Sequence, residues 1–209
     1  MTTRNDRSER ILRTAMHLFH ERGFDGVGVD LIGETAGMSG PAIYRYFSGK
    51  DEILMTLIDE AIDRVLMSTG GKFDDPREEL EHLVRGHVRR ALEERELMSV
   101  WTRERNCIPP AYRSRLRSRI NRYIDHWVEC LQSCYPEPSR DVIVAAVHAT
   151  HGLIDSTAMW PPKALRIAGI DQILCGIALQ GLEWLDNAKS HGATEPKTPR
   201  KRAAGNRSA

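Results

Sequence analysis

The sequence predicts an all-α protein, and three observations carry this prediction. Apolar residues recur every three to four positions through most of the 209 residues, which is the spacing of one face of a helix. No segment alternates apolar and polar residues with a period of two, so no strand is expected. Glycines and prolines stand where the helical patterns stop. We therefore expect several helices joined by short turns.

Composition narrows the classes of protein to which the chain can belong. Lys and Arg number 30 against 29 Asp and Glu, so the net charge of +1 does not by itself indicate a nucleic-acid partner. No apolar run approaches the roughly 20 residues that span a bilayer, and the N-terminus lacks the apolar core of a signal peptide. The four cysteines form no CxxC pair. We expect a cytoplasmic protein with reduced thiols and no membrane partner.

The first segments of the chain are short helices separated by glycines. Residues 1–8 are polar, and we expect a flexible arm. The helix that follows stops at Gly23, because glycine commonly ends a helix. An apolar-periodic segment over 29–36 ends at Gly37, and a third begins after Ser39.

The later segments are longer. Ser48 stands three residues before Asp51, a capping-box-like spacing that predicts the start of a fourth helix. Residues 68–76 are rich in turn-forming types and interrupt the helical pattern. Basic residues, Pro and Gly dominate after His191, which predicts a disordered basic tail. The remaining helices are expected over about 76–95, 112–134, 140–160 and 170–187.

Residues 29–47 have the pattern of a helix-turn-helix, whose second helix enters the major groove of DNA. Gly37 can take the positive φ of the turn. Ser39 suits the N-cap of the second helix and Pro41 its first turn. Phe47 is expected to face the inner seam. The pattern therefore predicts a DNA-binding unit within the first fifty residues.

The outward side chains of that unit give the candidate DNA contacts. Gly40 and Ala42 would let the backbone approach DNA, and Arg45 can form bidentate bonds to guanine. Hydroxyl and ammonium groups nearby can bind phosphates. Alternatively, the aromatic residues form only a core stripe. The phosphate-binding candidates are Ser39, Tyr44, Tyr46 and Lys50.

The text AMHLFHERGFDGVGVDLIGETAGMSGPAIYRYFSGKDEIL resembles the TetR-type one-component transcriptional repressors over about residues 8–56. Members usually carry Ser or Thr where Gly28 stands, so the cap of the second helix loses its side-chain bond here. Many members also have a basic residue near Gly40, followed by Gly and Thr or Ser, where this chain reads Gly-Pro-Ala. The DNA-binding candidates on this basis are Gly28, Ser39, Gly40, Pro41, Ala42, Tyr44, Arg45, Tyr46 and Lys50.

The resemblance implies a homodimer on a palindromic double-stranded operator, with a small-molecule effector that releases a repressor. The chain then divides into an arm (1–8), a helix-turn-helix domain (9–55), a helical ligand-binding and dimerisation domain (56–190) and a basic tail (191–209). Segments 140–160 and 170–187 are the dimerisation candidates, since they are apolar and rich in Ala and Gly. An intramolecular core is the alternative interpretation of the same pattern.

Aromatic and polar residues within the middle and late helices are the candidates for an effector pocket. The apolar 140–160 segment favours a largely hydrophobic effector. An acyl-CoA or lipid-like molecule would also suit the five arginines between Arg113 and Arg122, although pairing with Glu93, Glu94 and Glu96 is the simpler explanation of that run. The candidate lining residues are Trp101, Arg105, Tyr123, Trp127, His148, His151, Asp155 and Trp160.

Two other groupings contain residue types that can bind a metal. One consists of His148, His151 and Asp155, and the other of His126, Cys130 and Cys134; each lies on one helical face, and neither has a diagnostic spacing. No nucleotide-binding loop, GxSxG or HExxH motif is present in the sequence. We therefore expect no enzyme, no cofactor and no bound metal. A helical dimeric scaffold or a metal-binding protein without sequence-specific DNA binding remains the alternative.

Overall fold

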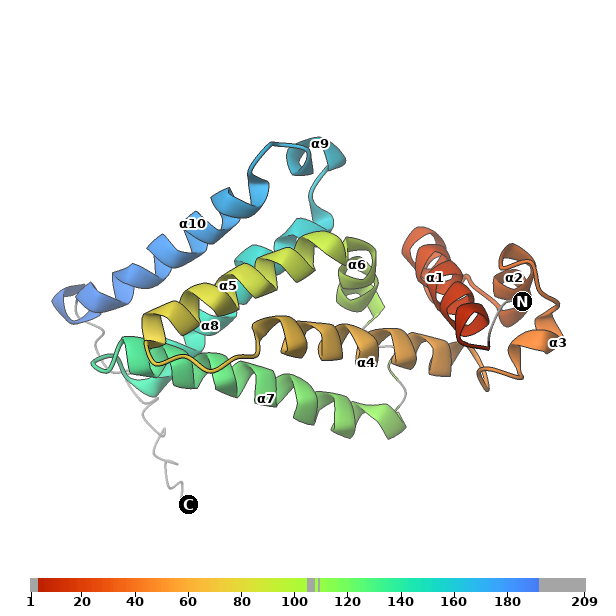
Figure 1. The fold of residues 1–209 in the computed structure, drawn as a ribbon, viewed down its shortest axis with the longest axis horizontal. Helices are drawn as coiled ribbons and strands as arrows, with labels where there is room; N and C mark the ends of the chain where they lie inside the picture. The colour runs from red at the N-terminus through yellow and green to blue at the C-terminus, as the bar shows by residue number, and fades with distance from the viewer. Residues whose placement is uncertain (1–3, 105–107, 109, 192–209) are drawn as a thin grey trace, which may run out of the picture.

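The computed structural model describes residues 4–104, 108 and 110–191, and it confirms the all-α prediction over those ranges, which contain helices and no strand. Figure 1 shows α1 to α3 together at one end, and α4 leading from them into a bundle of long helices. The α-helices are α1 (Arg4–Arg22), α2 (Val29–Thr35), α3 (Gly40–Ile43), α4 (Lys50–Thr69), α5 (Pro76–Glu93), α6 (Arg95–Glu104), α7 (Pro110–Cys134), α8 (Arg140–Asp155), α9 (Pro162–Leu165) and α10 (Ile170–Glu183). Two 3₁₀ segments, η1 (Ser156–Met159) and η2 (Trp184–His191), follow α8 and α10.

Two hydrophobic cores organise the molecule. The N-terminal core joins the apolar faces of α1 to α3 with the first half of α4, and it includes Phe19, Ile43 and Phe47. The main core lies among α5, α7, α8 and α10, around the fully buried Trp127. Helix α4 contributes to both, because Leu54 is buried in the first core and Val65, Leu66 pack against the second. The expected domain boundary after residue 55 therefore falls inside one continuous helix.

The ends of three helices differ from the expectation. Helix α1 begins at Arg4, within the expected arm. The third helix is shorter than predicted: it ends at Ile43, and the chain continues as turns, with the N–H of Tyr46 donating to Ile43 O at 2.8 Å. The predicted pairing of Ser48 with Asp51 is wrong, because α4 begins later and the Ser48 N–H donates to Glu52 at 2.5 Å. That hydrogen bond lowers the pKa of Glu52.

Two further predictions need correction. Helix α6 was not expected as a separate element; it begins just after α5 ends at Glu93. The stretch Arg140–Met159 is long and apolar enough to cross a membrane by length and composition, which corrects the expectation that no run approaches that length. Ile143, Val147 and Ile154 from this stretch are buried in the main core, and the core helix of a globular protein passes the same test.

Candidate DNA-binding surface and ligand cavity

Helices α2 and α3 cross at a pair of glycines. A Cβ on Gly33 would lie 3.0 Å from Gly40 N, and one on Gly40 would lie 1.9 Å from Asp30 Oδ1. Gly37 has the predicted positive φ of 65° in the turn between the helices, and Met38 N–H donates to Gly33 O at 2.8 Å. Gly40 therefore permits the helix crossing on its Asp30 side, and the approach of its half-buried backbone to DNA stays a prediction. Sequence reasoning also missed Gly33, which supplies the close approach.

The exposed face of this unit is formed mainly by Tyr44 and Arg45. Tyr44 is 59% exposed, Arg45 is exposed, and no hydrogen-bond or ion-pair partner of either side chain is found among the described residues. Pro41 is exposed and Ala42 half-buried beside them. Tyr46 differs from the expectation, since it is half-buried and packs against the N-terminal core.

The caps of both helices lack side-chain hydrogen bonds. Gly28 occupies the N-cap of α2, as predicted, with an extended backbone. Ser39 occupies the N-cap of α3, but its hydroxyl makes no capping bond and the residue is exposed. The predicted capping by the Ser39 side chain is therefore wrong, and this hydroxyl faces solvent beside Pro41.

Lys50 has an intramolecular role that the sequence did not reveal. Its Nζ donates to Phe24 O at 2.9 Å and lies 4.4 Å from the centre of the Phe24 ring. These contacts tie the start of α4 to the segment between α1 and α2. An ammonium group has three donors, so the others remain for a phosphate.

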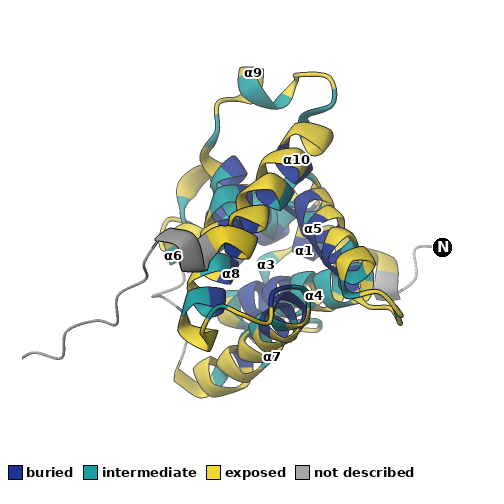
Figure 2. Ribbon diagram, turned by 90° about the vertical axis from the view of Figure 1, so that its left-hand side faces the viewer, coloured by how far each residue is buried: buried dark blue, intermediate teal, exposed yellow. Residues whose placement is uncertain are grey.

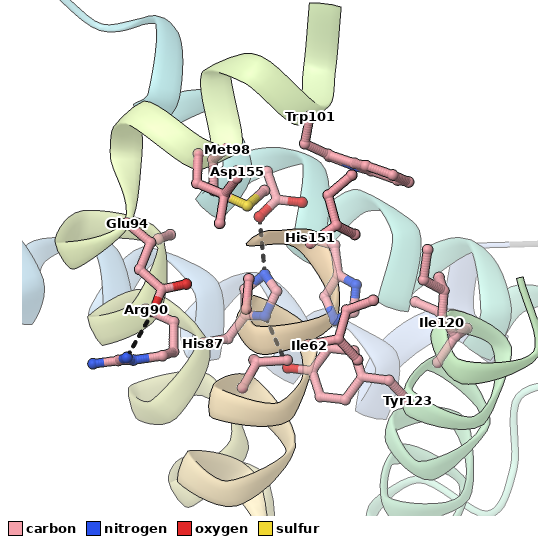
Figure 3. A pocket seen from close by; sticks show the side chains of 16 residues that line it. Ile62, His87, Arg90, Glu94, Met98, Trp101, Ile120, Tyr123, His151 and Asp155 are labelled. Carbon is pink, nitrogen blue, oxygen red and sulfur yellow. Dashed lines mark hydrogen bonds and ion pairs between the residues drawn. The ribbon is translucent and has the colours of Figure 1, made fainter. Parts of the chain in front are cut away.

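A cavity of about 180 Å³ lies among α4, α5, α6, α7 and α8 (Figure 3). Four of the predicted residues line it: Trp101, Tyr123, His151 and Asp155. The other lining residues are mostly aliphatic and include Ile58, Ala61, Ile62, Val65, Leu97, Met98, Ile120 and Ile124. The walls are thus mainly apolar, with a small number of polar groups.

The other predicted pocket residues do not line this cavity. Trp127 is fully buried behind it, edge-on to the His151 ring at 4.7 Å. His148 is exposed. Trp160 is half-buried elsewhere, where its indole donates to Ser156 Oγ at 3.1 Å. Arg105 lies outside the described residues. A helix exposes several faces, and the sequence alone did not identify the face that meets the cavity.

The polar end of the cavity is a chain of three side chains centred on His87, a residue that sequence reasoning missed. His87 Nδ1 lies 2.8 Å from the Tyr123 hydroxyl, and His87 Nε2 lies 3.1 Å from Asp155 Oδ1. Burial raises the pKa of Tyr123, so its hydroxyl keeps a proton to donate to Nδ1. With Nδ1 facing the Tyr123 hydroxyl, the Nε2–H of His87 donates to the Asp155 carboxylate.

His151 stacks on His87, with ring centres 4.5 Å apart. Burial, followed by the proximity of His87 and His148, lowers the pKa of His151 to about 2. Its imidazole is therefore neutral at ordinary pH. The nearby charged groups form a separate network, in which Arg90 pairs with Glu93 and with Glu94 Oε1, the latter at 3.0 Å.

Helix α6 contacts both the cavity and α1. Leu97, Met98 and Trp101 line the cavity. One turn further, Arg103 Nη2 donates to His20 O at 2.6 Å and to Phe19 O at 3.3 Å, at the carboxyl end of α1. Glu104 Oε1 accepts from Phe24 N–H at 3.2 Å. One rigid helix therefore joins the cavity wall to the DNA-binding unit.

The arginine-rich start of α7 is engaged in ion pairs, but not with the expected partners. Arg115 lies 2.6 Å and Arg119 lies 2.5 Å from the Asp59 carboxylate on α4, and Arg119 also pairs with Asp63. These contacts replace the expected pairs with Glu93, Glu94 and Glu96. Within the described part of the chain, no three His, Cys, Asp or Glu side chains form a metal-binding group.

An apolar surface lies along α8 and α10. Figure 2 shows that much of α10 is exposed. Ile177 is 53% exposed and Trp184, just after α10, is 51% exposed. They border a groove lined by small residues, including Ala145, Ala149 and Gly181. Both segments predicted for dimerisation contribute to this groove.

Two family models match this chain, and together they span more than half of it. The model for bacterial regulatory proteins of the tetR family matches residues 11–56, and the model for a tetracyclin repressor-like C-terminal domain matches residues 74–161. The first covers the helix-turn-helix unit described above. The second covers α5 to α8, including most of the polar residues of the cavity.

Individual proteins are also similar to this chain. The HTH-type transcriptional regulator EthR of Mycolicibacterium smegmatis is 34% identical over 89 residues, which cover 43% of this chain and 39% of that protein. Matches to the EthR proteins of other mycobacteria cover 33% of their length, so the chain matches only about a third of these relatives.

Solved structures share the fold. PfmR of Thermus thermophilus superposes with a TM-score of 0.73 at 20% identity, covering 83% of this chain and 97% of that one. AibR, solved in complex with isovaleryl coenzyme A and operator DNA, superposes with a TM-score of 0.71 at 18% identity, with the same two coverages.

Proposed function

Because the chain belongs to the TetR family of bacterial transcriptional regulators, we propose that it is a cytoplasmic repressor released from its operator by a small, largely hydrophobic effector. The observation that carries this proposal is the position of α6, which lines the cavity with Met98 and Trp101 and holds the end of α1 through Arg103. A ligand in the cavity would contact α6 directly, and DNA bound at α3 would affect α6 through the DNA-binding unit that α6 contacts.

On the DNA side, Arg45 reads bases and Tyr44 contacts phosphates. This assignment is supported by the exposure of both side chains and by the lack of a side-chain partner for either of them within the described residues. Ser39, Pro41 and Ala42 lie on the same short segment and adjoin the backbone of DNA. Lys50 and Tyr46 lie next to DNA phosphates and also stabilise the DNA-binding unit, Lys50 through Phe24 and Tyr46 through the N-terminal core. Gly28 and Gly40 contribute through the backbone of α2 and α3.

The functional unit is a homodimer, formed through the groove of α8 and α10. A single helix-turn-helix covers one half-site, and a twofold dimer presents two to a palindromic operator. The exposed Ile177 and Trp184 supply apolar area for this contact, and the glycines and alanines between them permit close helix approach.

Release follows from unequal binding of the effector to two states of the dimer. An effector shifts the population only by the difference between its affinities for the DNA-bound and free arrangements. Movement of α6 at Met98 would be passed to α1 by the hydrogen bonds from Arg103 and Glu104. The apolar lining supports a hydrophobic body for the effector. The paired arginines Arg115 and Arg119 give no support to a coenzyme A thioester.

Fluorescence anisotropy with the DNA flanking the coding region, across a salt series and against random duplex, tests the DNA-binding part. Binding that survives the competitor supports a sequence-specific regulator. Binding that random duplex abolishes contradicts an operator in that DNA. Failure to bind at low salt contradicts DNA binding and favours a dimeric scaffold.

A further inference from the structure

The cavity is lined by charged side chains in addition to its apolar walls. Three charged side chains line it: Arg90, Glu94 and Asp155. Arg90 is already paired with Glu93 and Glu94, and Glu94 also pairs with Arg64. The guanidinium groups of Arg64 and Arg90 are therefore paired with carboxylates, and Arg90 is the one Arg or Lys among the described lining residues.

Asp155 is the one lining carboxylate for which the structure gives no pairing with Arg or Lys among the described residues. Its side chain is 35% exposed. Oδ1 accepts from His87 Nε2 at 3.1 Å, and no partner for Oδ2 is found in the described part of the chain. The Tyr123 hydroxyl lies 2.8 Å from His87 Nδ1, so both ring nitrogens of His87 already have partners, and Asp155 Oδ2 is the carboxylate oxygen left for a ligand.

Two buried nitrogens of lining residues are not accessible to an anion. Arg90 Nε and His151 Nε2 have no hydrogen-bond partner among the described residues, but both atoms are fully enclosed by protein. The ring of His151 is also neutral, because burial lowers its pKa to about 2. An acid entering the cavity would meet Asp155 and Glu94 without an accessible, unpaired cation.

Size and aromatic lining narrow the ligand further. An apolar protein cavity of about 150 Å³ holds one benzene molecule, and this cavity measures about 180 Å³. Trp101 and Tyr123 form part of its wall, and aromatic faces attract cations. We infer that the cavity takes a small organic cation, an amine about one ring in size, whose ammonium group donates to Asp155 while its apolar body lies against the aliphatic wall and Trp101.

This inference rests on the proposed function only in treating the cavity as the effector site. Isothermal titration calorimetry on the purified full chain, with four probes, tests it directly: benzylamine, benzyl alcohol, ethylbenzene and benzoate. All four have the same ring and differ in charge and donors. We expect benzylamine to bind at least about tenfold more tightly than benzyl alcohol, because a hydrogen bond between charged groups is the stronger one. Isovaleryl coenzyme A serves as the thioester probe.

Asp155→Asn separates charge from shape, because the amide oxygen can still accept from His87 Nε2. This variant should lose at least about tenfold in benzylamine affinity and change benzyl alcohol affinity by less than about threefold. Asp141→Asn, an exposed aspartate in the first turn of the same helix, is the matched control and should leave both unchanged.

Three outcomes would overturn the inference. They are tighter binding of benzoate, benzyl alcohol or the thioester than of benzylamine; an unchanged benzylamine affinity in Asp155→Asn; and binding of none of the probes at millimolar concentration. The proposed function is judged separately, by whether any bound probe changes DNA affinity in the anisotropy assay. A probe that binds in calorimetry without affecting DNA would contradict release by this cavity and leave the ligand class intact.

Discussion

The DNA-binding unit and the ligand cavity are built in different ways. The unit is held together by contacts between residues close in sequence, such as Gly33 with Gly40 and Met38 N–H with Gly33 O. The cavity draws its walls from five helices, and its polar chain joins His87 to residues 36 and 68 positions away. The first is therefore determined by local turn chemistry, whereas the second depends on the packing of the whole domain.

The largest expected effect is at the α2–α3 crossing. Gly33→Val places a side chain 3.0 Å from backbone atoms, which cannot move aside as a side chain could. We expect a loss of about 1–3 kcal/mol in unfolding free energy and loss of specific DNA binding, while benzylamine binding persists. Urea unfolding and anisotropy measure the two effects. Gly152→Ala, which meets open space and lies on α8 outside the DNA-binding unit, is the control. Full DNA affinity in Gly33→Val would show that the crossing tolerates bulk.

The next effect concerns the proposed dimer contact along α8 and α10. Ile177→Asp puts a charge into the groove of α8 and α10, and we expect the dimer dissociation constant to rise at least about tenfold. Sedimentation velocity measures it. Ile167→Asp is a matched control, because both isoleucines are 53% exposed and Ile167 lies outside that groove. Equal behaviour of the two variants would argue against this interface.

The connection between the regions is tested at Arg103. Arg103→Ala removes the hydrogen bonds to His20 O and Phe19 O without altering a cavity-lining residue. Coupling free energies between sites are typically about 1–3 kcal/mol, and we expect this variant to lose most of that coupling. The measurement compares DNA affinity with and without a bound effector. Unchanged release would require a route other than this contact.

Within the DNA-binding unit, Arg45→Ala should relax specificity at one base position, at a cost of about 1–3 kcal/mol. Its side chain is exposed, so stability should be unaffected. Competition with single-base operator variants measures the change. An equal loss on random and specific DNA would make Arg45 a phosphate contact instead.

The smallest expected effect is at Lys50. Lys50→Ala should weaken binding to all sequences about equally and reduce the salt slope. Its bond to Phe24 O adds a small loss of stability that a purely exposed lysine would not cause. Salt-dependent anisotropy and thermal unfolding measure the two. A sequence-dependent loss would mean that Lys50 contributes to base reading.

This contrast also explains what the sequence could predict. The positive φ of Gly37, the buried position of Phe47 and the Gly28 cap follow from short-range rules. The half-burial of Tyr46 could not be predicted, because it depends on how the turn after Ile43 meets the core.

The lining of the cavity could be predicted only in part from the sequence. Trp101, Tyr123, His151 and Asp155 have an aromatic or polar character that stands out in apolar helices, and all four line it. His87 has no comparable local signal, since its partners come from α7 and α8. Similarly, Arg115 and Arg119 pair with Asp59 because α4 packs beside α7. Hydrophobic periodicity does not specify which helices pack together, so these partners could not be predicted.

The continuity of α4 through both cores has a mechanical consequence. Its 20 residues form a rod about 30 Å long, at 1.5 Å per residue. Ile62 of α4 lines the cavity, about 18 Å along the helix from Lys50. A tilt of about 5° about Ile62 would displace the Lys50 end by about 1.6 Å. In a twofold dimer, two opposed displacements would add to about 3 Å, against a spacing of about 34 Å between successive major grooves. A small angular change beside one ligand is thereby amplified geometrically, as in a lever, at the two recognition elements.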